Sequence, residues 1–474
     1  MAPSGEPSAT PAPPSPRRFA LALLALTLLG GALRLEVAWR THPTGLLGDE
    51  RYYVEVAARL ARGEGHLYVG GLEGEARAWR PPGHAFLLSL LLDPERVGRG
   101  DPERDAAPRA ALLGAELAIG TLLVAATGLL AAALFGPREG LLAAALAALE
   151  PALIAQAHML WSEGLFALLT TLALAAALRA AREPGALAWA AVAGLGFGLA
   201  ALVRELALGV AAACACWWLF PGRSAAPPPG GRRAAAARGA LALALAALVV
   251  APWTLRNARV LGRFVPVSTV GWFALAEGNS LEHPDWLLPD GPEQRRFHAG
   301  YFTRRDELQR LDYARAHALA RIRAEQPLWL ARKAVRNLAL LLHPDEVLRT
   351  KLRRGAYGDR PPAEIRVLLA AAAPAWAALF TAAVLGIAAA RAGGRRRLLL
   401  LVLGGVAAVH VLSNATPRFR LPWLPILCAA AAHAILAGRT LPHRLDRPGK
   451  LGTAAVLLFF FGVCVPYFAA YGGR

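Results

Sequence analysis

The chain has 474 residues, of which 56% are hydrophobic and only 18% charged, and its mean hydropathy is +0.39. Soluble proteins carry about 25% charged residues, and their apolar runs are too short to cross a bilayer. These values therefore exclude a soluble multidomain protein and a disordered chain, and four cysteines exclude a disulfide scaffold. The composition predicts an all-α polytopic membrane protein.

The net charge of +19 comes from 52 basic and 33 acidic residues, and nearly all the bases are arginines. A nucleic-acid partner would require a basic stripe with interleaved aromatic residues. Here the arginines cluster instead between apolar segments, which is typical of a membrane topology signal. We therefore expect membrane lipids, and no nucleic acid, as partners.

The first 18 residues are rich in Pro, Ser and Ala and predict a disordered tail. An apolar segment at 19–39 follows, and because no convincing small-residue cleavage site comes after it, we expect an uncleaved span rather than a signal peptide. Ten more apolar segments make about eleven spans, several near the lower length limit for crossing: 107–135, 141–157, 163–178, 187–203, 206–220, 240–253, 367–390, 398–413, 421–437 and 451–470.

The short connections on one side of these spans are rich in arginine, for example at Arg138, Arg179 and Arg395. The positive-inside rule places this side and the N-terminus in the cytoplasm, in an inner (plasma) membrane. Two long polar segments, 40–106 and 254–366, then fall on the exoplasmic side. The sequence thus predicts a cytoplasmic tail (1–18), spans 1–7 including exoplasmic loop one (19–253), a large exoplasmic loop with interfacial helices (254–366) and spans 8–11 (367–474).

Polar residues gather at the exoplasmic ends of the spans. Ionisable groups near a bilayer are costly, so such a cluster indicates a functional site. The residues concerned are Asp49, Glu50, Arg80, His84, His158, Trp161, Glu163, Arg204, Glu205, Arg256, Asn257, Arg418 and Arg420.

Each of these residues also has a structural interpretation. Asp49 and Glu50 suit the N-terminus of the helix that follows them, and Arg204 and Glu205 can neutralise each other. The later arginines can snorkel to lipid phosphates, and the two histidines can simply be buried. The sequence has no convincing metal-ligand spacing, P-loop, G-x-G-x-x-G or G-x-S-x-G motif.

The combination is more informative than its parts. A carboxylate can take a proton from a hydroxyl, and several arginines can hold a phosphate and stabilise it as a leaving group. Beside a membrane, that phosphate is expected to belong to a lipid. The residues predict group transfer from a lipid phosphate on the outer face.

Several blocks in order along the chain resemble the GT-C glycosyltransferases, and within them family 39, which contains the dolichyl-phosphate-mannose protein mannosyltransferase-like and aminoarabinose-transferase-like enzymes. The blocks are GDERYYVEVAARLARGEG with RPPGHAFLL, then EPALIAQAHMLWSEGLFALL, GLAALVRE, APWTLRNARVLGRFVPVST and TPRFRLPWLPIL. The chain lacks any sign of an added β-trefoil in its second large loop, which favours the bacterial branch.

The resemblance implies transfer with inversion from a polyprenyl-phosphate sugar to a glycan, lipid or protein acceptor. It implies Asp49 as the general base, with Glu50 the less suited of the pair. The implied phosphate-binding residues are Arg80, Arg204, Arg256, Arg418 and Arg420. Glu163, Tyr53, His84 and Asn257 are implied to orient the acceptor or balance charge, and neither the sugar nor a need for a divalent metal follows.

A transporter or flippase of lipid-linked sugars is the alternative, because it too would need many spans and buried charges. Transporters commonly show related halves and polar groups at the middle of the bilayer. This chain shows no clear repeat of its halves, and its charges lie at one face. These features favour the transferase.

Overall fold

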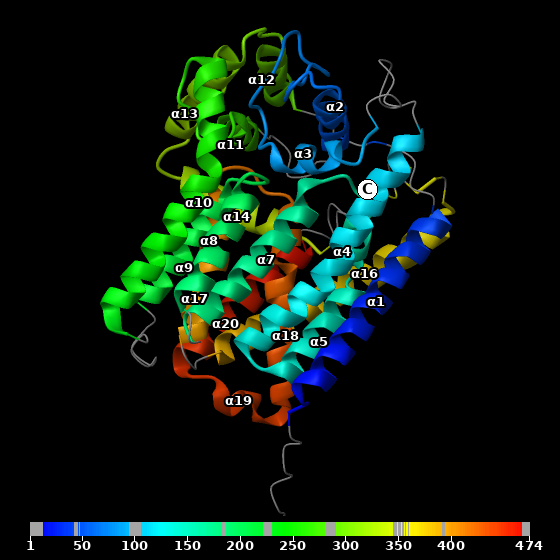
Figure 1. Cartoon of the computed structure of the whole chain (residues 1–474), viewed down its shortest axis with the longest axis vertical. Helices are drawn as coiled ribbons and strands as arrows, with labels where there is room; N and C mark the ends of the chain where they lie inside the picture. Colours follow the sequence, from blue (N-terminus) through cyan, green and yellow to red (C-terminus); the bar gives the residue numbers. More distant parts are fainter. Residues whose placement is uncertain are drawn as a thin grey trace, which may run out of the picture.

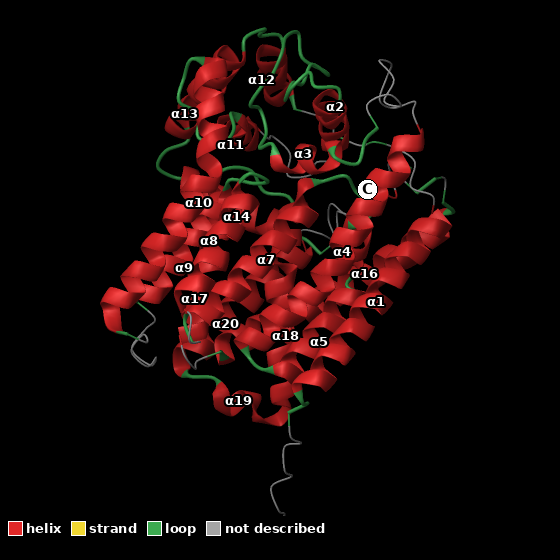
Figure 2. Cartoon of the chain, viewed as in Figure 1, coloured by secondary structure: helices red, strands yellow, loops and turns green. Residues whose placement is uncertain are grey.

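A computed structural model describes residues 13–41, 46, 48–93, 106–182, 186–220, 230–280, 291–344, 348, 352, 355, 357–358, 360–390 and 394–466. Residues 1–12 of the predicted tail and the end of the last predicted span, 467–470, lie outside this set. The described residues are almost entirely helices and loops (Figure 2), with a single isolated β-bridge between Tyr68 and Ala76.

Long helices run side by side in a bundle that makes up the larger part of the molecule (Figure 1). Among the described residues, seven helical segments are long and apolar enough to cross a membrane. They are Pro16–Thr41 (α1), Ala110–Leu134 (within α4, Ala106–Leu134), Ser162–Ala180 (α7), Gly231–Leu261 (α10), Pro362–Ala389 (α16), Pro417–Arg444 and Arg447–Cys464.

Two shorter apolar helices, α8 (Ala186–Ala201) and α9 (Leu206–Leu219), lie in the same bundle, as does α17 (Arg395–Leu412). The segment Pro417–Arg444 begins with a 3-10 helix, η2 (Pro417–Trp423), and continues as α18 (Leu424–Ala437), η3 (Gly438–Thr440) and α19 (Leu441–Arg444). Arg447–Cys464 consists of α20 (Arg447–Phe459) and a π-helical turn, η4 (Phe460–Cys464). The all-α polytopic architecture is confirmed, and the count of eleven spans stays a prediction.

The predicted span 141–157 is not one continuous helix. It is divided into α5 (Pro137–Leu149) and α6 (Pro151–Gln156) at Glu150, whose backbone is extended with φ −64° and ψ 116°. A residue before proline is disfavoured in the α conformation, because the proline ring clashes with its backbone. The apolar residues continue on both sides of this break, so hydropathy alone did not predict the effect of Pro151.

Small residues let the bundle helices approach closely. A Cβ atom on Gly194 of α8 would collide with the backbone of Ala242 in α10, and one on Gly386 of α16 would collide with the Ala430 carbonyl of α18. Close backbone approach at small residues is the usual way in which membrane helices gain packing energy.

A second layer of short helices covers one end of the bundle (Figure 1). It contains α2 (Asp49–Ala61), α3 (Gly83–Ser89), α11 (Val270–Ser280), α12 (Pro292–Phe302) and α13 (Glu307–Ala324), while α14 (Trp329–Leu342) packs against α17 and η2. The two predicted loops meet in this layer, where the Thr269 amide donates a hydrogen bond to the Ala78 carbonyl at 2.9 Å. The N-terminus of α1 and helix α19 lie at the opposite end.

Candidate active site

Asp49 is the first residue of α2 and follows Gly48, whose positive φ of +57° turns the chain into the helix. An acidic residue in a first helical turn is favoured by the helix dipole. Both carboxylate oxygens of Asp49, however, are in ion pairs. Oδ1 accepts a hydrogen bond from Arg80 at 2.7 Å, and Oδ2 lies 2.8 Å from Nη1 of Arg418. Its side chain therefore does more than favour the start of a helix.

Glu163 lies in the first turn of α7 and continues this network. Its Oε1 accepts from Nε of Arg418 at 2.5 Å and from Arg204 at 2.7 Å, and its Oε2 accepts from Nη2 of Arg418 at 3.1 Å. The residues thus form a charge chain, in the order Arg80, Asp49, Arg418, Glu163 and Arg204. It links α2 to η2 and to the turn between α8 and α9, at the junction of the bundle with the covering layer.

The charge chain holds three positive and two negative charges, so 3 − 2 leaves a net charge of +1. Aromatic rings lie against the guanidinium groups: Trp161 is 4.0 Å from that of Arg418, and Trp79 is 5.2 Å from that of Arg80. Each of the three arginine side chains is about one fifth exposed, whereas Glu163 is fully buried. An anion can therefore reach the arginines from outside while Glu163 holds two of them in place.

The charge chain also sets the ionisation of Asp49. Burial by itself would raise the pKa of this carboxyl, but the neighbouring guanidinium groups of Arg80 and Arg418 bring the pKa well below its usual range. Burial raises the pKa of the adjacent Tyr53 hydroxyl. Asp49 is thus a carboxylate, and Tyr53 a neutral phenol, at any physiological pH.

Glu50, the other half of the acid pair, has a different partner, a backbone amide. It is 2% exposed, and its Oε1 accepts a hydrogen bond from the Leu160 amide at 2.9 Å. His84, in the first turn of α3, is fully buried and packs edge-on against Tyr53 at 4.7 Å. Tyr53 and His84 are therefore buried rather than at an accessible surface.

Arg256 and Asn257 lie at the end of α10, outside the charge chain. Arg256 donates to the backbone carbonyls of Arg77 at 2.6 Å and His66 at 3.3 Å, and its guanidinium is 4.6 Å from the ring of Trp253. Asn257 is fully buried and donates to backbone carbonyls of the segment after the helix. The Arg256 contacts hold loop one against α10, and the Asn257 contacts hold the segment that follows α10.

Arg420 is also held elsewhere. It is 5% exposed, donates to the carbonyls of Leu341, His343 and Pro344, and stacks on Trp376 at 4.1 Å. The structure thus brings Arg80, Arg204 and Arg418 together with the two acids, and places Arg256 and Arg420 in backbone contacts away from them.

The other polar residues singled out in the sequence have local partners. His158 lies 3.2 Å from the Tyr357 hydroxyl and 3.0 Å from the Arg34 carbonyl. Glu205 accepts a hydrogen bond from Ser268 at 2.7 Å and also lies near enough to Arg204 to interact with its charge. Among the described residues, no group of three or more His, Cys, Asp and Glu side chains is placed to hold a metal ion.

Sequence reasoning missed two buried acids near the site. Glu116 lies inside α4, fully buried, with its Oε1 3.4 Å from Nε2 of His84. Glu307 starts α13 and accepts hydrogen bonds from the amides of Arg77 and Ala78 and from the Thr269 hydroxyl at 2.8 Å. A lone acid within an apolar span was the available signal for Glu116, because such residues are rare in membranes.

A cavity of about 370 Å³ lies beside the site, between the ends of α1, α6 and α16. Its wall is mainly apolar, with Val37, Ile154, Leu352 and Leu368 among its residues. The charged residues in the wall are Arg40, Arg360 and Glu364, and the two arginines are paired with Glu36 and Glu364. Tyr357, the partner of His158, also lines it. The apolar part of the wall suits an apolar chain.

No family model and no curated protein matches the sequence. Among solved structures, the archaeal oligosaccharyltransferase AglB from Archaeoglobus fulgidus, in complex with an inhibitory peptide and a dolichol-phosphate, matches with a TM-score of 0.57 and 14% identity over 94% of this chain and 55% of that chain. An Archaeoglobus fulgidus oligosaccharyltransferase tethered with an acceptor peptide containing the NVT sequon matches with a TM-score of 0.55 and 15% identity. The match covers 94% of this chain and 54% of that chain.

ArnT from Cupriavidus metallidurans bound to undecaprenyl phosphate matches at 16% identity over 90% of this chain and 79% of that chain, but its TM-score of 0.39 is too low to establish a common fold. The chain spans about half the length of the archaeal enzymes. At these identities the likeness shows the fold alone: this polytopic, all-helical chain shares the fold of the membrane part of its length with the archaeal oligosaccharyltransferase structures.

Proposed function

We propose that the protein is a glycosyltransferase that moves a sugar from a polyprenyl-phosphate donor to a glycan, lipid or protein acceptor, with inversion, on the exoplasmic or periplasmic face. The charge chain carries this proposal, because it places one accessible carboxylate between arginines that retain a net positive charge. The order of sequence blocks supports a family 39-like, bacterial enzyme, and the GT-C fold is compatible with it.

In the proposed reaction the donor phosphate binds to Arg80, Arg204 and Arg418. Asp49 takes the proton of the acceptor hydroxyl as the hydroxyl oxygen attacks the anomeric carbon from the side opposite the phosphate. The bond between the anomeric carbon and the phosphate oxygen breaks, and its electron pair leaves with the polyprenyl phosphate. The arginines stabilise the charge that develops on that oxygen. Glu163 acts as a positioning residue, because it contacts Arg204 and Arg418 and is fully buried.

The contacts of Asp49 imply an order of binding. With both oxygens paired to arginines and its pKa depressed, Asp49 is a weak base before the donor arrives. A donor phosphate that shares Arg80 and Arg418 weakens these pairs and raises the pKa of Asp49. Donor binding would therefore make Asp49 a stronger base, so a productive acceptor complex is expected to form after the donor is bound.

The isoprenoid tail of the donor would occupy an apolar cavity in the bundle. The apolar cavity between α1, α6 and α16 can take it, and Tyr357 and His158 connect the wall of this cavity to the carbonyl of Arg34 in α1. A transporter would not require a base paired with phosphate-binding arginines. Formation of a glycosylated product by the purified protein would exclude the transporter alternative.

The proposal is tested by measuring how tightly the protein binds undecaprenyl phosphate. Binding is detected through the change in unfolding temperature that the lipid causes. We expect Arg80→Gln, Arg204→Gln and Arg418→Gln each to weaken binding about 10- to 100-fold, since each removes a hydrogen bond to a charged group. A lysine at each of these positions should restore part of the binding, because it keeps the charge but lacks the bidentate geometry of arginine.

Arg256→Gln and Arg420→Gln are the matched controls. Each variant removes an arginine that the sequence places with the others but that contacts backbone carbonyls in the structure. We therefore expect a lower unfolding temperature, while donor binding is nearly retained. Loss of binding in both controls, with retention in the first three variants, would reject the charge chain as the donor site.

A further inference from the structure

Arg34 is a charged residue inside the membrane-spanning helix α1, outside the charge chain, and its side chain is fully buried. An ionisable group within a membrane-spanning segment is costly, so its place there calls for specific partners. In α5 these partners are backbone carbonyls: Nη2 of Arg34 donates to Ala147 at 3.0 Å, and Nη1 donates to Ala148 at 3.3 Å. Arg34 therefore joins α1 to the C-terminal end of α5.

The break between α5 and α6 explains why these carbonyls need a donor. In a continuous helix the Ala147 carbonyl would accept from the amide four residues later. That residue is Pro151, which has no N–H. Ala147 is fully buried and Ala148 is 2% exposed, and a buried carbonyl without a hydrogen bond is costly. The Arg34 side chain supplies the donor that Pro151 lacks.

The backbone of Arg34 contacts the other end of α6. Its carbonyl lies 3.0 Å from Nε2 of His158, two residues after that helix, and because a carbonyl only accepts, Nε2 is the donor. A Cβ atom on Gly120 of α4 would lie 2.8 Å from the Cβ of Ala157 and 3.3 Å from Nε of Arg34, so this glycine leaves room for the guanidinium beside α6. Arg34 thus holds the chain before and after α6.

Helix α6 forms one wall of the cavity of about 370 Å³ between α1, α6 and α16, which we call the tail cavity. Ile154 and Ala155 line it from α6, while Val37 and Thr41 line it from α1, three and seven residues after Arg34. The contacts of Arg34 therefore fix two walls of the tail cavity relative to each other.

We propose that Arg34 is a positioning residue for the donor lipid: by fixing α6 against α1 it sets the shape of the tail cavity, and thereby the preference for a long isoprenoid chain. This inference rests on the proposed function, because it takes the ligand of the tail cavity to be the tail of a polyprenyl phosphate. It adds that a residue outside the charge chain determines which donor lipids bind tightly.

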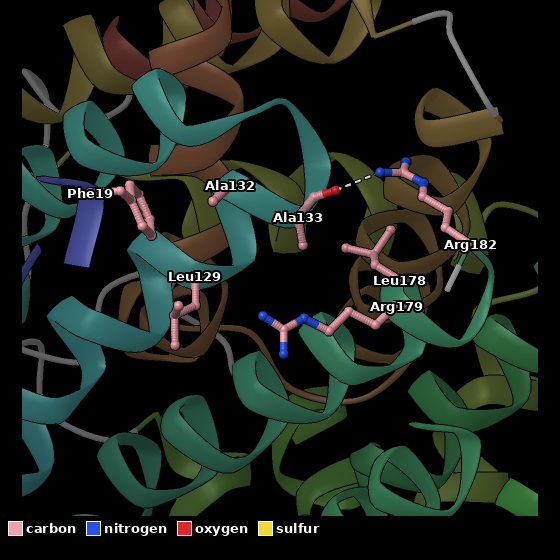
Figure 3. Close-up of a pocket in the computed structure, with 7 residues that line it drawn as sticks. All are labelled: Phe19, Leu129, Ala132, Ala133, Leu178, Arg179 and Arg182. Carbon is pink, nitrogen blue, oxygen red and sulfur yellow. Dashed lines mark hydrogen bonds between the residues drawn. The ribbon is translucent and has the colours of Figure 1, made fainter. Parts of the chain in front are cut away.

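Two arginines at the opposite end of the bundle also donate to carbonyls near the ends of helices. Arg238 of α10, which is 2% exposed, donates to the Ala180 carbonyl of α7 at 3.1 Å. Arg182 donates to the Ala133 carbonyl of α4 at 2.7 Å, beside a separate cavity of about 290 Å³ (Figure 3). Neither arginine is among the described residues that line the tail cavity. Arg238 is the matched control, because it is a buried arginine in a similar contact far from that cavity.

The test uses the full chain in detergent and measures the dissociation constants of undecaprenyl phosphate and of citronellyl phosphate, whose chain is much shorter. Each buried methylene is worth about fourfold in affinity, so the wild type should bind undecaprenyl phosphate at least about tenfold more tightly. Arg34→Met removes the donors but keeps an unbranched side chain. It should bring the ratio of the two constants close to one by weakening the binding of undecaprenyl phosphate, whereas citronellyl phosphate, held by the charge chain, should bind as before.

Two further variants separate positioning from stability. Arg34→Lys keeps a donor for one carbonyl and should keep part of the ratio. In the double variant Arg34→Met/Pro151→Ala, the added amide can donate to the Ala147 carbonyl, so the unfolding temperature lost in Arg34→Met should recover. The ratio should stay close to one, because α5 and α6 would then run on as one helix. Arg238→Met should lower the unfolding temperature and keep the wild-type ratio.

The inference is wrong if Arg34→Met keeps the wild-type ratio, or if Arg238→Met loses it to the same extent. Recovery of the ratio together with the unfolding temperature in the double variant would give Arg34 a purely structural role. A wild type that binds both lipids equally would show that the tail cavity does not hold the chain. Failure of the proposed function has a different result, since the wild type would then bind neither lipid, and the inference would fail with it.

Discussion

Asp49 and Glu50 are adjacent in the sequence but lie in different environments. Successive residues on an α-helix are about 100° apart around the axis, so Asp49 faces Arg80 and Arg418 while Glu50 faces the Leu160 amide. One carboxylate has accessible cationic partners, and the other is a buried hydrogen-bond acceptor. The geometry therefore favours Asp49 as the base.

Replacing Asp49 by asparagine keeps the size of the side chain and removes the proposed base. We expect Asp49→Asn to insert and bind undecaprenyl phosphate, while glycosyl transfer falls by about 10²- to 10⁴-fold, the usual contribution of general-base catalysis. The measurement is the amount of glycosylated product that is formed by membranes from deletion cells expressing each variant.

Glu50→Gln is the control for this prediction. Its amide oxygen can still accept from Leu160, so transfer should stay within a few-fold of the wild type. An active Asp49→Asn with an inactive Glu50→Gln would move the base to Glu50, and full activity in both would reject the mechanism.

At the scale of elements, Glu307 connects the two segments that form the covering layer. Its carboxylate accepts from the backbone of loop one at Arg77 and Ala78, and from Thr269 after α10. Arg256 contacts the same stretch of loop one through the Arg77 carbonyl. The Glu307 carboxylate therefore holds the backbone of loop one at Ala78, two residues before Arg80.

We expect Glu307→Gln to destabilise the layer by about 1–3 kcal/mol, because one oxygen acceptor becomes a donor and a buried amide loses its partner. Hydrogen exchange at residues 75–80 should become faster, and the unfolding temperature should fall. Asp312→Asn, on the same helix, removes an exposed pair with Arg263 and should leave both unchanged. Equal effects of the two variants would contradict this role for Glu307.

At the scale of the whole molecule, buried histidines make stability depend on pH. Burial, with the nearby Arg256 charge, lowers the pKa of His66 from 6.5 to about 4. The unfolded state therefore binds a proton at a pH where the folded state does not, so stability is lost as the pH falls from about 6.5 towards 4. The loss from His66 reaches about 3 kcal/mol near pH 4.

His66→Asn should consequently show a smaller fall in unfolding temperature between pH 7 and pH 5 than the wild type. His443→Asn, at an exposed position of α19, should retain the slope of the wild type. Identical slopes in all three proteins would show that His66 does not contribute.

The orientation of the whole molecule is a further prediction. In a Cys216→Ala background, which removes the exposed native thiol, Ala316→Cys on α13 should react with an impermeant maleimide in intact spheroplasts. Arg232→Cys at the start of α10 should react only after permeabilisation, because arginine-rich connections stay in the cytoplasm. The reverse pattern would place the charge chain on the wrong side for the proposed function.

The sequence by itself determined that the protein is helical and membrane-spanning, and which end of its bundle collects polar residues. These properties are local: apolar length sets a span, and arginine in short connections sets its direction. Helix ends were less well determined, because a break such as that at Glu150 depends on one proline within an apolar run.

Only the tertiary structure decided which arginines act together. Arg418 and Arg420 are two residues apart in η2, and with three residues per turn in a 3-10 helix their side chains point in different directions. Arg418 meets Asp49 and Glu163, whereas Arg420 meets the backbone after α14. Sequence spacing gives the angle between two side chains. The partners of Arg420 are 76 to 79 residues away and Glu163 is 255 residues from Arg418, and only packing brings these segments together.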